Sequence, residues 1–126
     1  MRYLLDSNII IAAMSGTSEP LLHRLAACDE GEVVTSSIAL AEVVLGSRKG
    51  KPPSVDRLRS FVSEVPVLDF DYRAALAYAT LPFRRGGFDR LIAAHALSHR
   101  LTVVTNNARH FAEIPDLRVE DWTQSP

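Results

Sequence analysis

Three acidic residues lie in otherwise apolar segments, and their types suit metal-dependent chemistry. Asp6 lies between YLL and IIIAA, Glu42 is the one charged residue between Val33 and Gly46, and Asp89 begins the stretch DRLIAAHAL. Carboxylates are rarely buried unless they are paired or bind a metal. Like charges brought close together repel, so a cation would have to join them. Hard, oxygen-preferring Mg²⁺ is the natural ion, with Mn²⁺ as the alternative.

Each of these acids also has a purely structural explanation. Asp6, Ser7, Asn8 and Asp89 are residue types that cap helix N-termini. Asp89 could instead lie in the first turn of its helix and share a face with apolar residues that pack on a sheet. Glu42 has no basic residue three or four positions away in its own helix. Its structural alternatives are therefore a long-range pair with an arginine or a half-exposed place at the edge of an apolar stripe.

The spacing of the histidine and cysteine residues does not indicate a zinc site. Zinc sites use Cys and His at close, regular spacing, whereas the four histidines, at positions 23, 95, 99 and 110, are scattered. The one cysteine, Cys28, lies in a helical pattern. We expect these side chains to pack in the interior or to lie on helix surfaces.

Short apolar segments alternate with helical patterns along the chain. Strands are expected at residues 2–6, 33–36, 65–70 and 101–105, with a last short one at 118–122. Helices are expected over residues 8–14, 19–31, 37–46, 55–64, 71–81 and 89–100, with Gly31 and Gly46 ending two of them and a turn at FRRGGF. This alternation predicts an α/β domain whose parallel sheet is covered on both faces.

The predicted strands place two polar positions at one edge of the sheet. Functional crevices in such sheets lie beyond the carboxyl ends of the strands. Asp6 follows the first strand, and the corner Thr105-Asn106-Asn107 follows the strand LTVVT. We therefore expect the functional site at this edge.

Composition narrows the class of protein. With 126 residues the chain fits one domain. It has 14 basic and 15 acidic residues, for a net charge of −1, which gives no support for a broad nucleic-acid surface but allows local basic clusters. The apolar run at 9–14 is too short to cross a membrane, and a single cysteine fits a reducing compartment. These features predict a soluble, cytoplasmic protein.

Five segments follow one another over nearly the whole chain: LLDSNIII, SSIALAEVVLG, FDRLIAAHAL, VVTNNARHF and LRVEDW. Together they resemble the PIN-domain ribonucleases, specifically the VapC toxins of bacterial toxin–antitoxin pairs. The resemblance implies that residues 1–126 form a single PIN domain, an α/β/α sandwich with a central, mainly parallel sheet of short strands. It also implies a Mg²⁺-dependent endoribonuclease that cuts structured RNA, either tRNA or rRNA, to inhibit translation. The implied partners are a VapB-type antitoxin and a second copy of the chain in a homodimer.

The resemblance also implies roles for single residues. Asp6 and Asp89 would be direct metal ligands, and Glu42 a ligand or the group that orients the attacking water. The fourth family position, often aspartate, is Asn107 here. Its neutral oxygen could still orient a metal-bound water, but it lowers the charge of the pocket and leaves open whether one or two metals bind. Ser7 and Asn8 would add hydrogen bonds around the metal ligands, or serve only as helix caps.

Two basic clusters are candidates for contact with RNA phosphates. Arg48 and Lys49, together with Lys51, form one cluster, and Arg84, Arg85 and Arg90 form another just before Asp89. Phosphate contacts position a nucleic acid but do not specify its sequence. A solvated loop is the structural alternative for both clusters.

Other protein classes that place an acidic residue at a strand end fit this sequence less well. A receiver module requires a lysine after a late strand, and a haloacid-dehalogenase-like phosphotransferase requires Asp-x-Asp after its first strand; neither motif is found here. The serious alternative is a PIN-like domain that binds RNA or a protein partner without cleavage, which the neutral Asn107 makes credible.

Overall fold

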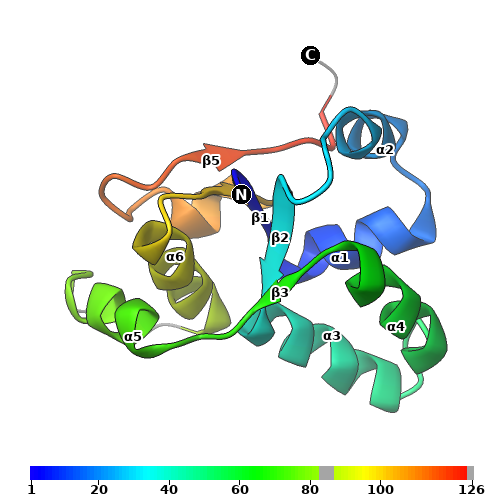
Figure 1. Cartoon of the computed structure of the whole chain (residues 1–126), viewed down its shortest axis with the longest axis horizontal. Helices are drawn as coiled ribbons and strands as arrows, with labels where there is room; N and C mark the ends of the chain where they lie inside the picture. Colours follow the sequence, from blue (N-terminus) through cyan, green and yellow to red (C-terminus); the bar gives the residue numbers. More distant parts are fainter. Residues whose placement is uncertain (83–86, 125–126) are drawn as a thin grey trace.

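Five short strands form one parallel sheet in the computed structural model, which describes residues 1–82 and 87–124 (Figure 1). The order across the sheet is β3-β2-β1-β4-β5, and every neighbouring pair of strands is parallel. The central strand β1 therefore has both its edges paired. The strands are β1 (Tyr3–Leu5), β2 (Val33–Ser36), β3 (Val67–Leu68), β4 (Thr102–Val104) and β5 (Val119–Glu120).

Helices cover both faces of this sheet, as an α/β/α sandwich requires (Figure 1). The helices α1 to α4 follow β1 and β2 on one side, whereas α5 and α6 connect β3 back to β4 on the other. This placement confirms the predicted fold class. The bounds are α1 (Ser7–Ser15), α2 (Glu19–Ala26), α3 (Ser37–Arg48), α4 (Val55–Glu64), α5 (Tyr72–Ala79), α6 (Phe88–Ser98) and a 3-10 helix, η1 (Ala108–Phe111).

Local sequence explains where these helices begin. Five of them start after a Ser or Asp whose side chain accepts a hydrogen bond from a backbone N–H of the first turn. The central strands β1, β2 and β4 are buried along their whole length, so they show no alternation of apolar and polar residues, whereas the edge strands β3 and β5 are half-buried. The core is built around Leu4, Leu5 and Val103 of the sheet, with Ile9 and Ile92 packed on it, and all five side chains are fully buried.

Two helix ends differ from the prediction. The helix expected to stop at Gly46 continues to Arg48, because an interior glycine costs only about 1 kcal/mol and Gly46 is not in the left-handed region. Gly50, with φ +88°, follows its end instead. The helix expected to reach Gly31 stops at Ala26, since residues 29–32 must form the turn that leads into β2. The 3-10 helix η1 was not expected.

Two further expectations are a turn at FRRGGF and the absence of a segment that crosses a membrane. Most of the predicted FRRGGF turn, residues 83–86, lies outside the described residues. Within residues 1–82 and 87–124, no helix is long and apolar enough to cross a membrane.

Truncation of Leu4 should destabilise the fold strongly. Leu4 is fully buried on the central strand, whereas Val55 at the start of α4 is 45% exposed. We expect Leu4→Ala to lower the free energy of unfolding by about 2–5 kcal/mol and Val55→Ala to change it by less than about 0.5 kcal/mol. Urea denaturation followed by circular dichroism measures both. Equal losses in the two variants would contradict the proposed core.

Candidate active site

Asp6 lies at the carboxyl end of β1 and is almost fully buried, with 4% of its surface exposed. It is the N-cap of α1, where its Oδ1 accepts a hydrogen bond from the Ile9 N–H at 3.0 Å. The Thr105 side chain, directly after β4, makes a second hydrogen bond to it. Burial raises the pKa of Asp6, and the negative charges of Asp89 and Asp121 add to that rise, while the two hydrogen bonds oppose it. The capping role is therefore real, but it does not account for a buried charge beside other carboxylates.

Glu42 projects from the middle of α3 and is half-buried. A hydrogen bond with the side chain of Ser7 lowers its pKa, but burial has the larger effect and raises it, with Asp89 and Asp6 adding to the rise. Its Oε1 is buried without a hydrogen-bond partner. Among the ion pairs formed within the described residues, none joins Glu42 to an arginine, so that structural alternative is not supported.

Asp89 lies in the first turn of α6, whose N-cap is Gly87. Asp89 is therefore not the cap. Ile92, Ala93 and Ala96 on this helix are fully buried, as expected for the face that packs on the sheet. The Oδ2 of Asp89 lies 2.8 Å from Nδ1 of His110 in η1, and its side chain remains 39% exposed.

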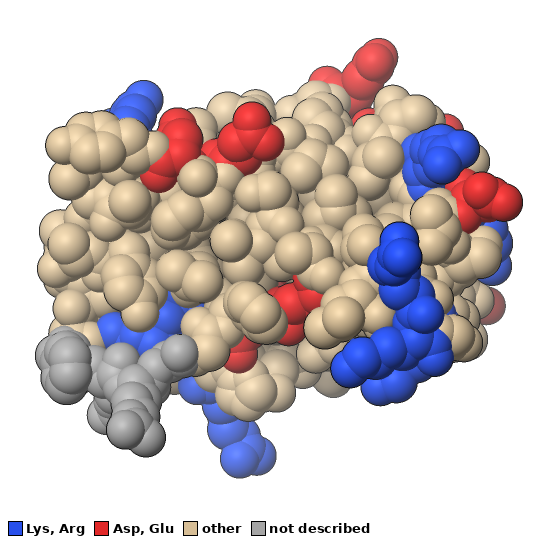
Figure 2. All heavy atoms as spheres, turned by 90° about the horizontal axis from the view of Figure 1, so that it is seen from below, with Lys and Arg blue, Asp and Glu red and all other residues tan. Residues whose placement is uncertain are grey.

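The structure thus brings Asp6, Glu42 and Asp89 from three separate elements into electrostatic range of one another. Asp6 is affected by the charge of Asp89, and Glu42 by the charges of both other residues. Figure 2 shows the face at the carboxyl ends of the strands, where acidic atoms lie recessed among neutral side chains near the middle. The arrangement is chemically suited to a cation, and the catalytic and metal-binding roles of these residues stay predictions.

Asn107 lies close to this group, but its side chain is engaged with a neighbour. Its Nδ2 is 3.0 Å from Nε2 of His110, and its backbone N–H donates to Thr105 Oγ1 at 3.0 Å. The predicted role of Asn107 in orienting a water is untested by this geometry.

Of the two polar residues after Asp6, Ser7 lies beside Glu42, and its side chain lowers the pKa of that carboxyl; its part in the site stays a prediction. Asn8 is exposed on α1. Its part in the site stays a prediction.

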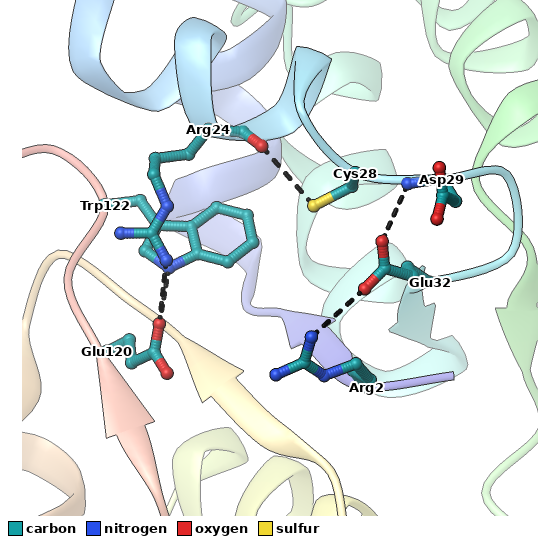
Figure 3. Close-up of polar contacts among 7 residues, drawn as sticks. All are labelled: Arg2, Arg24, Cys28, Asp29, Glu32, Glu120 and Trp122. Atoms are coloured by element: carbon teal, nitrogen blue, oxygen red, sulfur yellow. Dashed lines mark hydrogen bonds and ion pairs between the residues drawn. The ribbon is translucent and has the colours of Figure 1, made fainter.

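Sequence reasoning overlooked two residues at the site, His110 and Asp121, whereas Thr105 lies in the corner that it had singled out. Asp121 follows the last strand, so the strand-end rule that singled out Asp6 could have found it as well. Its neighbours anchor it to α2 (Figure 3): Arg24 lies 4.6 Å over the Trp122 ring, and both side chains bond to Oε1 of Glu120, at 3.1 Å and 2.8 Å. His110 was set aside because isolated histidines carry no ligand spacing.

The basic residues are placed as follows. Arg48 and Lys49 are exposed where α3 ends, at the end of the molecule where Figure 2 shows basic side chains gathered. Arg90 donates a hydrogen bond from its guanidinium to the carbonyl of Pro82. Arg84 and Arg85 lie outside the described residues. Contact of any of these with RNA stays a prediction.

The carboxylates fit an open metal site more closely than a closed one. Within the described residues, no three Asp, Glu, His or Cys side chains are placed to enclose a metal ion together. Mg²⁺ ordinarily takes one or two protein carboxylates and fills its remaining positions with water and substrate phosphate. The buried, unpartnered Oε1 of Glu42 and the raised pKa values of Asp6 and Glu42 are the features that a cation would relieve.

The chain is similar to known proteins in both sequence and structure. The family model described as PIN domain matches residues 3–117. A tRNA(fMet)-specific endonuclease VapC of Shigella flexneri is 34% identical, over 98% of this chain and 99% of the relative. A ribonuclease VapC2 of Rickettsia felis is 32% identical, over 97% of this chain and 98% of the relative. A crystal structure of VapBC2 from Rickettsia felis, bound to a promoter DNA fragment, aligns with a TM-score of 0.86 at 31% identity, covering 97% of this chain and 99% of that one.

Removal of one negative charge should stabilise the metal-free protein at neutral pH. The folded-state pKa of Glu42 is raised, so its ionisation costs stability above that pKa, and the cost disappears as the pH falls below the unfolded value near 4. We expect Glu42→Gln to gain up to about 1 kcal/mol at pH 7 after solvent screening, and much less at pH 4. Thermal melts in EDTA at both pH values measure this.

The exposed residue Glu30 provides the control. Glu30→Gln should melt like the parent at both pH values. A clear loss of stability in Glu42→Gln at pH 7 would contradict carboxylate repulsion at the site.

Proposed function

We propose that this chain, which belongs to the PIN-domain family and is a VapC-type ribonuclease, cleaves RNA with the help of a divalent metal. Asp6 and Asp89 are the proposed ligands, and Glu42 is either a further ligand or the group that orients the attacking water. One observation supports this site above the others: carboxylates from β1, α3 and α6 interact at the edge of the sheet where α/β proteins place their ligands. Mg²⁺ is the proposed ion, with Mn²⁺ as a substitute, because the donors are oxygen atoms.

The geometry assigns each carboxylate a different task. Bound Mg²⁺ would supply acidity to a water and positive charge to the phosphate. Asp6 is held by Ile9 and Thr105, so it offers a ligand of fixed orientation. Asp89 keeps Oδ1 available, since its Oδ2 contacts His110. Glu42 Oε1 has no partner and is the acceptor to which an attacking water can donate. Its raised pKa makes it a better proton acceptor than an ordinary glutamate.

The proposed substrate is structured RNA, either tRNA or rRNA. The relatives include tRNA(fMet)-specific endonucleases, and their names supply the substrate class that we extend to this chain. Arg48, Lys49 and Arg90, together with Arg84 and Arg85, are proposed to bind its phosphates. Cleavage of such RNA would inhibit translation, so we propose that the protein is the toxin of a type II toxin–antitoxin pair.

A VapB-type antitoxin and a second copy of the chain are the proposed protein partners. Several of the related structures are complexes of VapB with VapC. In this chain, Tyr72 and Leu76 on α5 and Leu45 on α3 are 76%, 52% and 54% exposed. Tyr72 and Leu76 lie four residues apart on one helix, and such an exposed apolar pair is suited to a surface that a partner covers.

Cleavage should depend on Asp6 and on a divalent metal. We expect the protein with Mg²⁺ to cut tRNA or rRNA, and EDTA to stop it. Loss of residues that merely support metal ligands costs about 10–100-fold, so loss of a ligand in Asp6→Asn should cost at least about 100-fold. Gel analysis of labelled RNA measures the rate, and expression of the parent alone should arrest bacterial growth while Asp6→Asn should not.

Asp29→Asn, which alters an exposed aspartate, is the matched control and should remain active. A parent protein that binds RNA but leaves it intact with either Mg²⁺ or Mn²⁺ would favour the alternative of a non-cleaving PIN-like domain. An Asp6→Asn protein as toxic as the parent, at equal level, would contradict the nuclease assignment.

The protein should be a homodimer in solution. Light scattering is expected to give twice the chain mass of 13.9 kDa. Leu76→Glu places a charge on the exposed face of α5 and should shift the measured mass toward that of one chain. Ser63→Glu, at an exposed position of α4, should not change it. A parent that remains monomeric at high concentration would refute the prediction.

A further inference from the structure

A chain of hydrogen bonds joins Asp89 to the corner that follows β4. His110 Nδ1 lies 2.8 Å from Asp89 Oδ2, and His110 Nε2 lies 3.0 Å from Asn107 Nδ2. The contact between His110 and Asp89 was not foreseen from the sequence, because 21 residues separate them.

The partners on each side determine which ring nitrogen carries the proton. A carboxylate oxygen can only accept, so Nδ1 of His110 must donate to Asp89. The amide nitrogen of Asn107 can only donate, so Nε2 must accept. With the Asn107 amide in this orientation, His110 Nδ1 carries the hydrogen that the Asp89 carboxylate accepts, and Nε2 accepts from Asn107.

The backbone around His110 is itself well anchored. Phe111 and Ile114 are 2% and 7% exposed and hold η1 against the core. The His110 N–H donates to the Asn107 carbonyl at 3.1 Å.

The same corner reaches Asp6. The N–H of Asn107 donates to Thr105 Oγ1 at 3.0 Å, and the Thr105 side chain hydrogen-bonds to Asp6. The path Asp6–Thr105–Asn107–His110–Asp89 thus connects two of the proposed metal ligands.

We propose that His110 is a positioning residue for Asp89. Its Nδ1–H holds Oδ2 and fixes the rotation of the carboxylate, which leaves Oδ1 for a divalent metal, and Asn107 acts through His110. The inference rests on the proposed function, since it assigns a role to a neighbour of a proposed ligand.

Metal affinity in the absence of RNA is the appropriate test. Partners that orient metal ligands typically contribute about 10–100-fold to affinity. We expect His110→Ala to weaken Mn²⁺ binding about 10-fold, measured by the electron paramagnetic resonance signal of free Mn²⁺. His110→Asn places an amide N–H close to the position of Nδ1, so it should recover most of that affinity.

His99→Ala is the matched control. His99 follows the other end of α6, ten residues from Asp89 and about 15 Å away along the helix. It should bind Mn²⁺ like the parent. Thermal melts in EDTA should be similar for the parent and His110→Ala, because the His110 side chain is 56% exposed.

Kinetics separate positioning from general damage. At saturating Mn²⁺, His110→Ala should recover kcat to within a few-fold of the parent, with KM for RNA unchanged. A loss of kcat that no Mn²⁺ concentration restores would overturn the positioning role.

Affinity alone separates the two hypotheses. Equal Mn²⁺ affinity in parent and His110→Ala would overturn the inference and leave the proposed function intact. A parent that binds no Mn²⁺ would overturn both, and weak binding in His110→Asn as well as His110→Ala would show that the donor position is not what matters.

Discussion

Mutual repulsion of carboxylates at one edge of a parallel sheet is the constraint on which this molecule depends. Asp6 and Glu42 both have raised pKa values, chiefly through burial and further through neighbouring acids. The packing that buries these side chains stabilises the fold, but it also removes water from around their charges. The site therefore stores unfavourable electrostatic energy, which a bound cation would relieve.

The packing around the site is strong enough to hold these charges in place. Leu5 precedes Asp6, and Ile9 follows it, and both are fully buried. On α6, the fully buried Ile92 lies three residues after Asp89. Full burial of one such side chain contributes about 1.5–3 kcal/mol, more than a carboxylate loses to a shift of one pKa unit. Acids set between apolar residues are thus positioned by their neighbours, which is why the pattern is visible in the sequence.

That same logic explains how far prediction could go. β-branched runs predicted the strands, capping residues predicted helix starts, and the strand-end rule put Asp6 beside the corner at Thr105. The contact between His110 and Asp89 was beyond reach, since nothing local relates the two residues. The predicted helix end at Gly46 was wrong because a glycine costs little in a helix interior. The one at Gly31 was wrong because the turn that leads into β2 ends α2 earlier.

The neutral side chain of Asn107 fits this electrostatic balance. Asp121 already adds its charge to that of Asp89 near Asp6. An aspartate at position 107 would place another negative charge beside them and raise the cost of the metal-free fold. The Asn107 amide adds no charge, and its hydrogen bond to His110 belongs to the chain of contacts that ends at Asp89. Asparagine at this position is thus compatible with the proposed active site, because the role proposed for it acts through the orientation of a ligand and not through charge.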